Sequence, residues 1–189
     1  MTKQMGLSDN AKDYLCRFYC IFDEMMQKMT SAELNDSISH NFIVQMVPHH
    51  QAAIDMSNNI LRYTTNVTLQ CIAQNIVKEQ TEGIEKMNGM LACCTDCKNS
   101  CRDLCLYQHS IDAIMQKMFA QMKVSRTSNR LDCVFISEMI PHHRGAVEMS
   151  KTALQFCACK ELRPILQNIY TSQRKGIMQM AHLASCLGC

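Results

Sequence analysis

The chain has 189 residues, of which 47% are hydrophobic and only three are proline, so it can bury a sizeable core and is not a disordered chain. A formal net charge of +2 and the lack of any long run of Lys or Arg argue against a nucleic-acid or membrane-surface partner. No stretch is apolar for the length of a transmembrane helix, and residues 1–10 lack the apolar core of a secretory signal, so we expect a cytoplasmic protein.

Hydrophobic residues at helical spacing predict three helices in the first half of the chain. They are expected over about 9–29, 36–63 and 66–91. Few glycines, no tryptophan and abundant Met, Leu, Ile, Gln and Lys favour helix over sheet. Pro48 lies inside the second helix and should either kink it or mark a fresh start, because proline removes a backbone donor and crowds the preceding turn.

The second half of the chain repeats the first at a constant offset of 93 residues. The offset pairs Tyr14 with Tyr107 and holds without gaps across about ninety residues, which indicates a tandem duplication. It predicts helices over about 101–122, 129–156 and 161–185, within two repeats that span 1–93 and 94–189. Two such hairpins predict an all-α fold, an antiparallel four-helix bundle with additional flanking helices in one domain.

The longest identity between the repeats is a double-histidine motif. Residues 46–57 read MVPHHQAAIDMS and residues 139–150 read MIPHHRGAVEMS. At 100° per residue, the two Met and two His of each copy fall within an arc of about 120°, the width of one core-facing stripe. Asp55 and Glu148 fall on the opposite side, where we expect them to be solvated or paired.

These ligand types indicate a soft or borderline metal ion. Imidazole binds copper, zinc, iron and nickel, whereas thioether sulfur is a good ligand only for soft ions such as Cu(I). The sequence contains no Glu-x-x-His, which argues against a di-iron bundle, and no His-Glu-x-x-His, which argues against a zinc protease. The alternative is that the histidines are hydrogen-bonded core residues and the methionines fill space. Four His in two duplicated, Met-flanked pairs favour metal binding.

The motif Met-Val/Ile-Pro-His-His-x-x-Ala-x-x-Met, followed about thirty residues later by Gln-x-x-x-Ile-x-x-Met, resembles the bacterial family called domain of unknown function 305. The resemblance covers about 37–91 and 130–183, and it implies a ferritin-like helical bundle associated with copper binding and tolerance. Where relatives commonly have an acidic residue after the Gln, this chain has Gly83 and Gly176. Many relatives look exported, unlike this N-terminus. The positions that correspond to the motif are Met46, His49, His50, Met56 and Met87, and Met139, His142, His143, Met149 and Met180.

Thirteen cysteines are many for a cytosolic protein, and an odd number cannot all pair within one chain. A run with four-residue spacing lies where the repeats meet, and it comprises Cys93, Cys97, Cys101, Cys105 and His109, with Cys94 beside it. If helical, it would form a stripe of thiols that resembles those of cysteine-rich four-helix-bundle copper-storage proteins. Thiolate is a soft ligand, so Cu(I) is again the best match.

Turn-forming residues in the same run leave a second interpretation open, in which a loop interrupts the stripe. Cys94-x-x-Cys97 and Cys186-x-x-Cys189 would then form a four-thiolate zinc clip between the ends of the two repeats. Some cysteines are expected to be plain buried residues, and these are Cys71 and Cys133. His40 and His182 have no histidine partner in the other repeat and are expected at the surface or at helix caps.

The sequence therefore predicts a non-enzymatic protein that sequesters or buffers Cu(I) through its His and Met sites, with the Cys93–Cys105 run as an auxiliary site. One alternative is a redox enzyme that uses a metal held in a ferritin-like bundle. Another is a structural scaffold stabilised by zinc. The expected partner is a metal ion, with no nucleic acid and no membrane, and the sequence leaves a homodimer open.

Overall fold

The computed structural model describes residues 6–94, 97–124, 127–156 and 159–189, and of residues 92–94 it describes the backbone only. The described residues contain six α-helices and no strand: α1 (Asp9–Thr30), α2 (Ile38–Leu61), α3 (Val67–Cys94), α4 (Cys101–Lys123), α5 (Leu131–Gln155) and α6 (Arg163–Leu187). Every predicted helix is present, with its ends within three residues of those expected. No helix of the described residues has the length and apolar character needed to cross a membrane.

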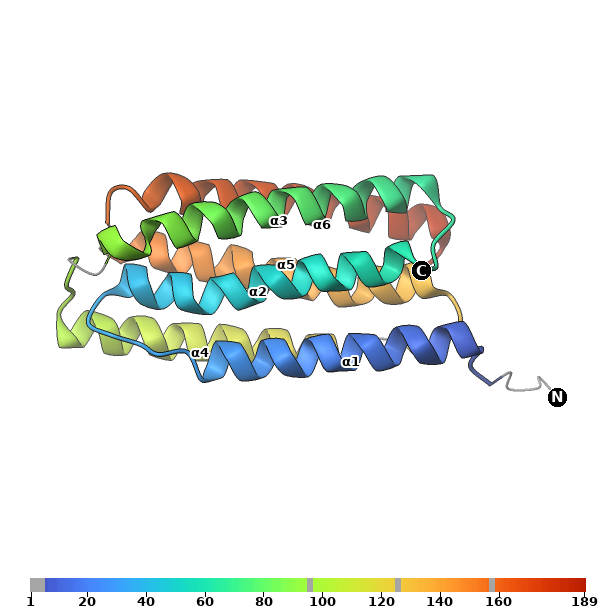
Figure 1. Ribbon diagram of the computed structural model, residues 1–189, viewed down its shortest axis with the longest axis horizontal. Helices are drawn as coiled ribbons and strands as arrows, with labels where there is room; N and C mark the ends of the chain where they lie inside the picture. The colour runs from blue at the N-terminus through green and yellow to red at the C-terminus, as the bar shows by residue number, and fades with distance from the viewer. Residues whose placement is uncertain (1–5, 95–96, 125–126, 157–158) are drawn as a thin grey trace.

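The helices pack in three layers of two (Figure 1). Helices α2 and α5 form the middle layer and contact each other, α3 and α6 cover one side, and α1 and α4 cover the other. Helices α2, α3, α5 and α6 thus make the four-helix bundle, and α1 and α4 flank it. The prediction of an all-α fold of antiparallel helical hairpins is confirmed.

Local sequence signals set where these helices begin and end. The hydroxyl oxygens of Ser8, Ser37 and Ser100 accept backbone N–H groups in the first turns of α1, α2 and α4, at 3.2, 3.3 and 3.1 Å. Such N-caps satisfy donors that have no partner within the helix. Gly188 caps the C-terminus of α6, and its φ of 66° is the left-handed conformation that glycine adopts at low cost.

Proline inside α2 and α5 does not divide either helix. Pro48 lies within the single helix α2, and Pro141 lies at the same repeat position in α5. A fresh start at Pro48 is therefore wrong. Because the middle layer is packed on both sides, burial of its apolar faces offsets the lost backbone hydrogen bond.

The core continues through all three layers. Phe22 of α1 meets Phe119 of α4 edge to face, with ring centroids 6.1 Å apart, so the flanking helices also pack on each other. The methionines of the flanking helices, Met25, Met29, Met118 and Met122, are at most 2% exposed. They fill the core beneath the flanking helices.

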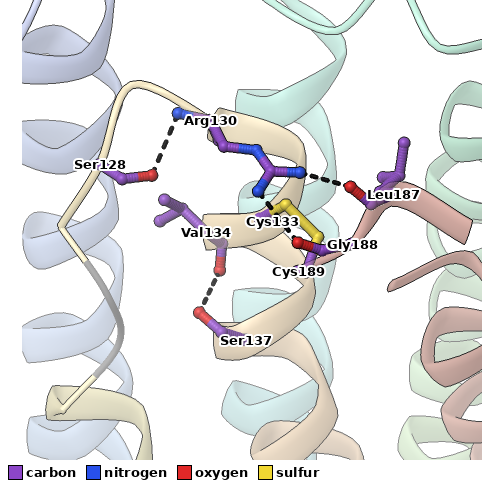
Figure 2. Close-up of a disulfide and its surroundings, with 8 residues drawn as sticks. All are labelled: Ser128, Arg130, Cys133, Val134, Ser137, Leu187, Gly188 and Cys189. Atoms are coloured by element: carbon purple, nitrogen blue, oxygen red, sulfur yellow. Dashed lines mark hydrogen bonds between the residues drawn. A yellow bond between two sulfur atoms is a disulfide. The ribbon is translucent and has the colours of Figure 1, made fainter. Parts of the chain in front are cut away.

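One end of the bundle carries a covalent cross-link (Figure 2). Cys133, in the first turn of α5, forms a disulfide with Cys189, beyond the end of α6, although 56 residues separate them in sequence. The Arg130 guanidinium donates to the carbonyls of Leu187 and Gly188 beside it. The prediction that Cys133 is a plain buried thiol is wrong, because the α5–α6 hairpin brings the start of one helix to the end of the other.

Candidate metal centre

Two histidines meet where α2 crosses α5. The rings of His49 and His142 stack with centroids 3.6 Å apart and planes inclined by 27°. Each Nε2 lies 3.1 Å from the backbone carbonyl oxygen of the other histidine. A carbonyl only accepts hydrogen bonds, so in the neutral ring each Nε2 carries the hydrogen and each Nδ1 carries the lone pair.

One ring nitrogen of each histidine in the double-histidine motifs lacks a hydrogen bond. The Nδ1 atoms of His49, His50, His142 and His143 are all buried without a hydrogen bond, and these residues are at most 2% exposed. Buried polar atoms are rarely left unpaired, and an unpaired one indicates a bound water, an ion or a functional role. Imidazoles that bind metals usually donate their other N–H to a backbone carbonyl or a carboxylate, as His49 and His142 do here.

Further unpaired polar atoms occur in the four helices of the bundle, again in repeat-related pairs. They are Ser57 Oγ and Ser150 Oγ, and Gln80 Oε1 and Gln173 Oε1. Ser57 and Ser150 follow the histidines on α2 and α5, whereas Gln80 and Gln173 come from α3 and α6. The interior of the bundle therefore offers several uncompensated acceptor atoms in each half.

Burial keeps the four histidines neutral. Desolvation is the largest cause that lowers the pKa of His50 to about 3 and that of His142 to about 4. The pKa values of His49 and His143 are also held well below the ordinary value, first by burial and then by the neighbouring imidazoles. Neutral imidazole is the form that binds metals, so protons compete little for these nitrogens near neutral pH.

The methionines of the predicted site are also buried in the core. All six methionines of the predicted site are at most 1% exposed, and they are Met46, Met56, Met87, Met139, Met149 and Met180. Helices α2 and α5 supply the first two of each repeat, and α3 and α6 supply the third. The structure thus buries every histidine and methionine of the predicted His/Met set. Asp55 and Glu148 lie outside it, where Asp55 accepts from Gln51 and Glu148 pairs with Lys117.

Two glycines lie against the second histidine of each motif, His50 and His143. A Cβ atom on Gly83 would lie 2.8 Å from Cδ2 of His50, and one on Gly176 would lie 2.9 Å from Cδ2 of His143. Any larger residue would force these imidazoles to move. Both glycines depart from the family pattern, and the sequence motif alone does not place them at the site. Their recurrence at one repeat position inside a helix was the available signal.

The cysteine run does not form one stripe. Helix α3 ends at Cys94 and α4 begins at Cys101, so a connection separates the two groups of thiols. Cys101, Cys105 and His109 lie on exposed positions of α4, and Cys97 is half-buried. The side chains of Cys93 and Cys94 lie outside the described residues. Within the described part of the chain, no three His, Cys, Asp or Glu side chains converge on one point.

The zinc clip is wrong for this fold. The α3–α4 connection, which contains Cys97, and the C-terminus lie at opposite ends of the bundle (Figure 1). Cys189 is also bonded to Cys133 and is not a free thiolate. The prediction that Cys71 is buried is wrong as well, because this thiol is exposed.

The fold and the site define a class of protein: a doubled helical hairpin that encloses paired histidines and methionines. The chain belongs to the family described as domain of unknown function (DUF305), whose profile matches residues 22–91 and 39–184. The resemblance stated from the sequence motif is thereby confirmed. Among curated proteins no significant match was found.

Three solved structures share the fold. CopM in the Ag-bound form is 27% identical, with a TM-score of 0.59 over 78% of this chain and 94% of that one. CopM in the Cu(I)-bound form is 26% identical, with a TM-score of 0.59 over 82% and 99%. A DUF305 fragment from Deinococcus radiodurans is 23% identical, with a TM-score of 0.58 over 78% and 95%, and it supports the fold alone.

Proposed function

We propose that this protein binds Cu(I) in its core and sequesters or buffers it. The observation that carries the proposal is the state of the histidines: four buried, neutral imidazoles whose Nδ1 atoms have no hydrogen bond. In His49 and His142 the opposite nitrogen already donates to a backbone carbonyl, the support that metal-bound imidazoles usually have. The four histidines would be the primary ligands, with the buried methionine sulfurs beside them.

The donor set and the relatives support a soft monovalent ion. Imidazole and thioether together match Cu(I) better than any hard cation. The two similar structures of CopM hold Cu(I) and Ag, both of which are soft ions. Zinc would favour imidazole or thiolate and would leave the methionines unused.

Burial of the histidines favours holding an ion over turnover. A metal-dependent redox enzyme needs an open coordination position that substrate can reach. The four histidines are at most 2% exposed, so an ion among them would be screened from solvent. Exchange with the outside would then require local opening of the outer helices.

The exposed thiols would add a second place to bind the ion. Cys97, Cys101, Cys105 and His109, with Cys93 and Cys94, would serve as an accessible auxiliary site. The cytoplasmic location stays a prediction. The Cys133–Cys189 disulfide weighs against it, because such bonds persist mainly in oxidising compartments.

The test separates the core from the thiols. Metal-free protein is alkylated under native conditions, which blocks the exposed thiols and leaves the buried histidines and methionines intact. Cu(I) is then titrated anaerobically against a chromophoric chelator of known affinity. We expect the alkylated protein to retain Cu(I), and the alkylated His49→Ala/His142→Ala variant to bind at least about tenfold more weakly, a difference of about 1.4 kcal/mol.

The matched control is alkylated His109→Ala, which removes a histidine from the surface of α4. It should bind like the parent protein, because alkylation has already disabled the thiols around it. Unchanged affinity in the His49→Ala/His142→Ala variant, with its helical content intact by circular dichroism, would remove the histidine core from the function.

A further inference from the structure

A groove between α3 and α6 gathers soft donor groups that the core site does not use. Cys71 of α3 and His182 and Cys186 of α6 all line it, and its volume is about 510 Å³. All three side chains are exposed. The other lining residues are apolar or carry hydroxyl or amide groups, and none is a carboxylate, so the groove offers little to a hard cation.

The spacing of two of these donors fits a metal ion of low coordination number. Cys186 Sγ lies 3.9 Å from His182 Nε2, one turn away on α6. With metal–sulfur and metal–nitrogen bonds of about 2.3 and 2.0 Å, an ion bound to both atoms at this separation has an S–metal–N angle of about 130°. This angle exceeds the tetrahedral value and leaves room for a third ligand on the ion.

We propose that this groove is a second, solvent-accessible site for Cu(I), in which the Cys186 thiolate and His182 Nε2 bind the ion. Cys71, which reaches the same groove from α3, supplies a third ligand. No three donors converge there in the described structure, so the Cys71 side chain turns toward the pair on binding. The ion replaces the Cys186 thiol proton, which passes to water, and no electron is transferred. The site does not depend on the histidine core.

The repeat supports a site that belongs to one half only. At the offset of 93 residues, His182 corresponds to Gly89 and Cys71 corresponds to Pro164. The equivalent position between the C-terminal end of α3 and the start of α6 therefore has only Cys93 of the three donors. His182 and Cys71 thus have no equivalent donor in the other repeat, and both line this groove.

The experiment reads out each thiol separately. The full-length protein receives enough Cu(I) to fill both proposed sites, in the presence of a thiol-free chromophoric chelator that competes for weakly held ions. A maleimide is then added, and its incorporation at each cysteine is measured by peptide mass spectrometry. We expect Cu(I) to slow labelling of Cys186 at least about tenfold, a difference equivalent to about 1.4 kcal/mol of binding.

Three variants test the ligand set. His182→Ala should lose the protection of Cys186, and Cys71→Ala should weaken it. Gln179→Ala, which changes a residue of the same groove that carries no sulfur or imidazole, should keep it. If Cu(I) does not slow the labelling of Cys186 in the parent protein, the proposal is overturned. The same holds if Cu(I) slows it equally in His182→Ala, because Cys186 would then bind Cu(I) without the imidazole.

A fourth variant separates this proposal from the core site. In His49→Ala/His142→Ala protein, protection of Cys186 should persist, whether or not the core binds Cu(I). Loss of protection there, in a variant that keeps its helical content, would contradict the independence of the groove.

Discussion

At its paired histidines, the interior of the middle layer has the same residues and contacts in both repeats, whereas the outer surface that carries the thiols differs between them. Inside, His49 and His142 make the same contact in both directions, 3.1 Å from Nε2 to the other carbonyl. Toward the surface, the half-buried Cys133 corresponds to His40, and the exposed Cys71 corresponds to Pro164. Reciprocal packing at the pseudo-two-fold axis couples the two copies, because a change in one removes a partner from the other. Exposed positions have no such coupling and are free to diverge.

One buried pair shows how far the symmetry extends. Tyr14 OH donates to the buried carboxylate of Glu138 at 2.6 Å. The repeat-related residues are Tyr107 and Gln45, and both Tyr107 OH and Gln45 Oε1 are buried without a hydrogen bond. The duplicated tyrosines thus share burial and differ in hydrogen bonding, which gives a matched pair for experiment.

Acid should have the largest effect, because it acts on the symmetric interior. Burial lowers the pKa of His50 to about 3 and that of His142 to about 4, whereas an unfolded histidine titrates near 6.5. The stability that these rings contribute is therefore fully present above pH 6.5 and is lost as the pH falls toward 4. We expect urea unfolding of the metal-free protein to show a loss on the order of 5 kcal/mol between pH 7 and 4.

A buried and an exposed histidine provide the comparison for that experiment. His143→Gln should reduce the dependence of the unfolding free energy on pH, and His109→Gln on the surface of α4 should leave it unchanged. An unfolding free energy that stays constant from pH 7 to 4.5 would contradict the neutral, buried state of the imidazoles.

Removal of the disulfide should have the next largest effect, on the divergent surface. Cys133→Ala opens a link between residues 56 positions apart, and the chain-entropy account gives a loss of about 4 kcal/mol. Thermal and urea unfolding under non-reducing conditions measure it. Cys71→Ala, at an exposed thiol, should leave stability within about 0.5 kcal/mol. Equal stability of Cys133→Ala and the parent protein would show that the link contributes nothing to the fold.

The paired tyrosines should differ by about 2 kcal/mol. Tyr14→Phe removes a hydrogen bond to a buried carboxylate and should destabilise the protein by about 1.5–3 kcal/mol. Tyr107→Phe removes a hydroxyl without a partner and should be neutral or slightly stabilising. Urea unfolding at pH 7 measures the free energy of unfolding of both variants. Equal losses of stability would mean that the two halves are energetically equivalent at this position.

The smallest effect on stability is expected at a glycine beside the site. In Gly83→Ala a clash with His50 costs about 1–3 kcal/mol and the helix gains about 1 kcal/mol, a net loss of about 1 kcal/mol. The displaced imidazole should also weaken Cu(I) binding by the alkylated protein. Gly89→Ala, on the same helix with open space around it, should stabilise the protein and leave binding unchanged. Similar binding in both variants would place His50 outside the metal centre.

The sequence alone determined the helices, the doubled hairpin and the inward direction of Met46, His49 and His50, because helical period and repeat offset are local patterns. Only the tertiary structure decided three further features. They are the stacking of His49 on His142, the close approach of Gly83 to His50 and the pairing of Cys133 with Cys189. Each depends on how helices that are distant in sequence approach one another in space. The spacing of residues along one helix carries no information about that approach.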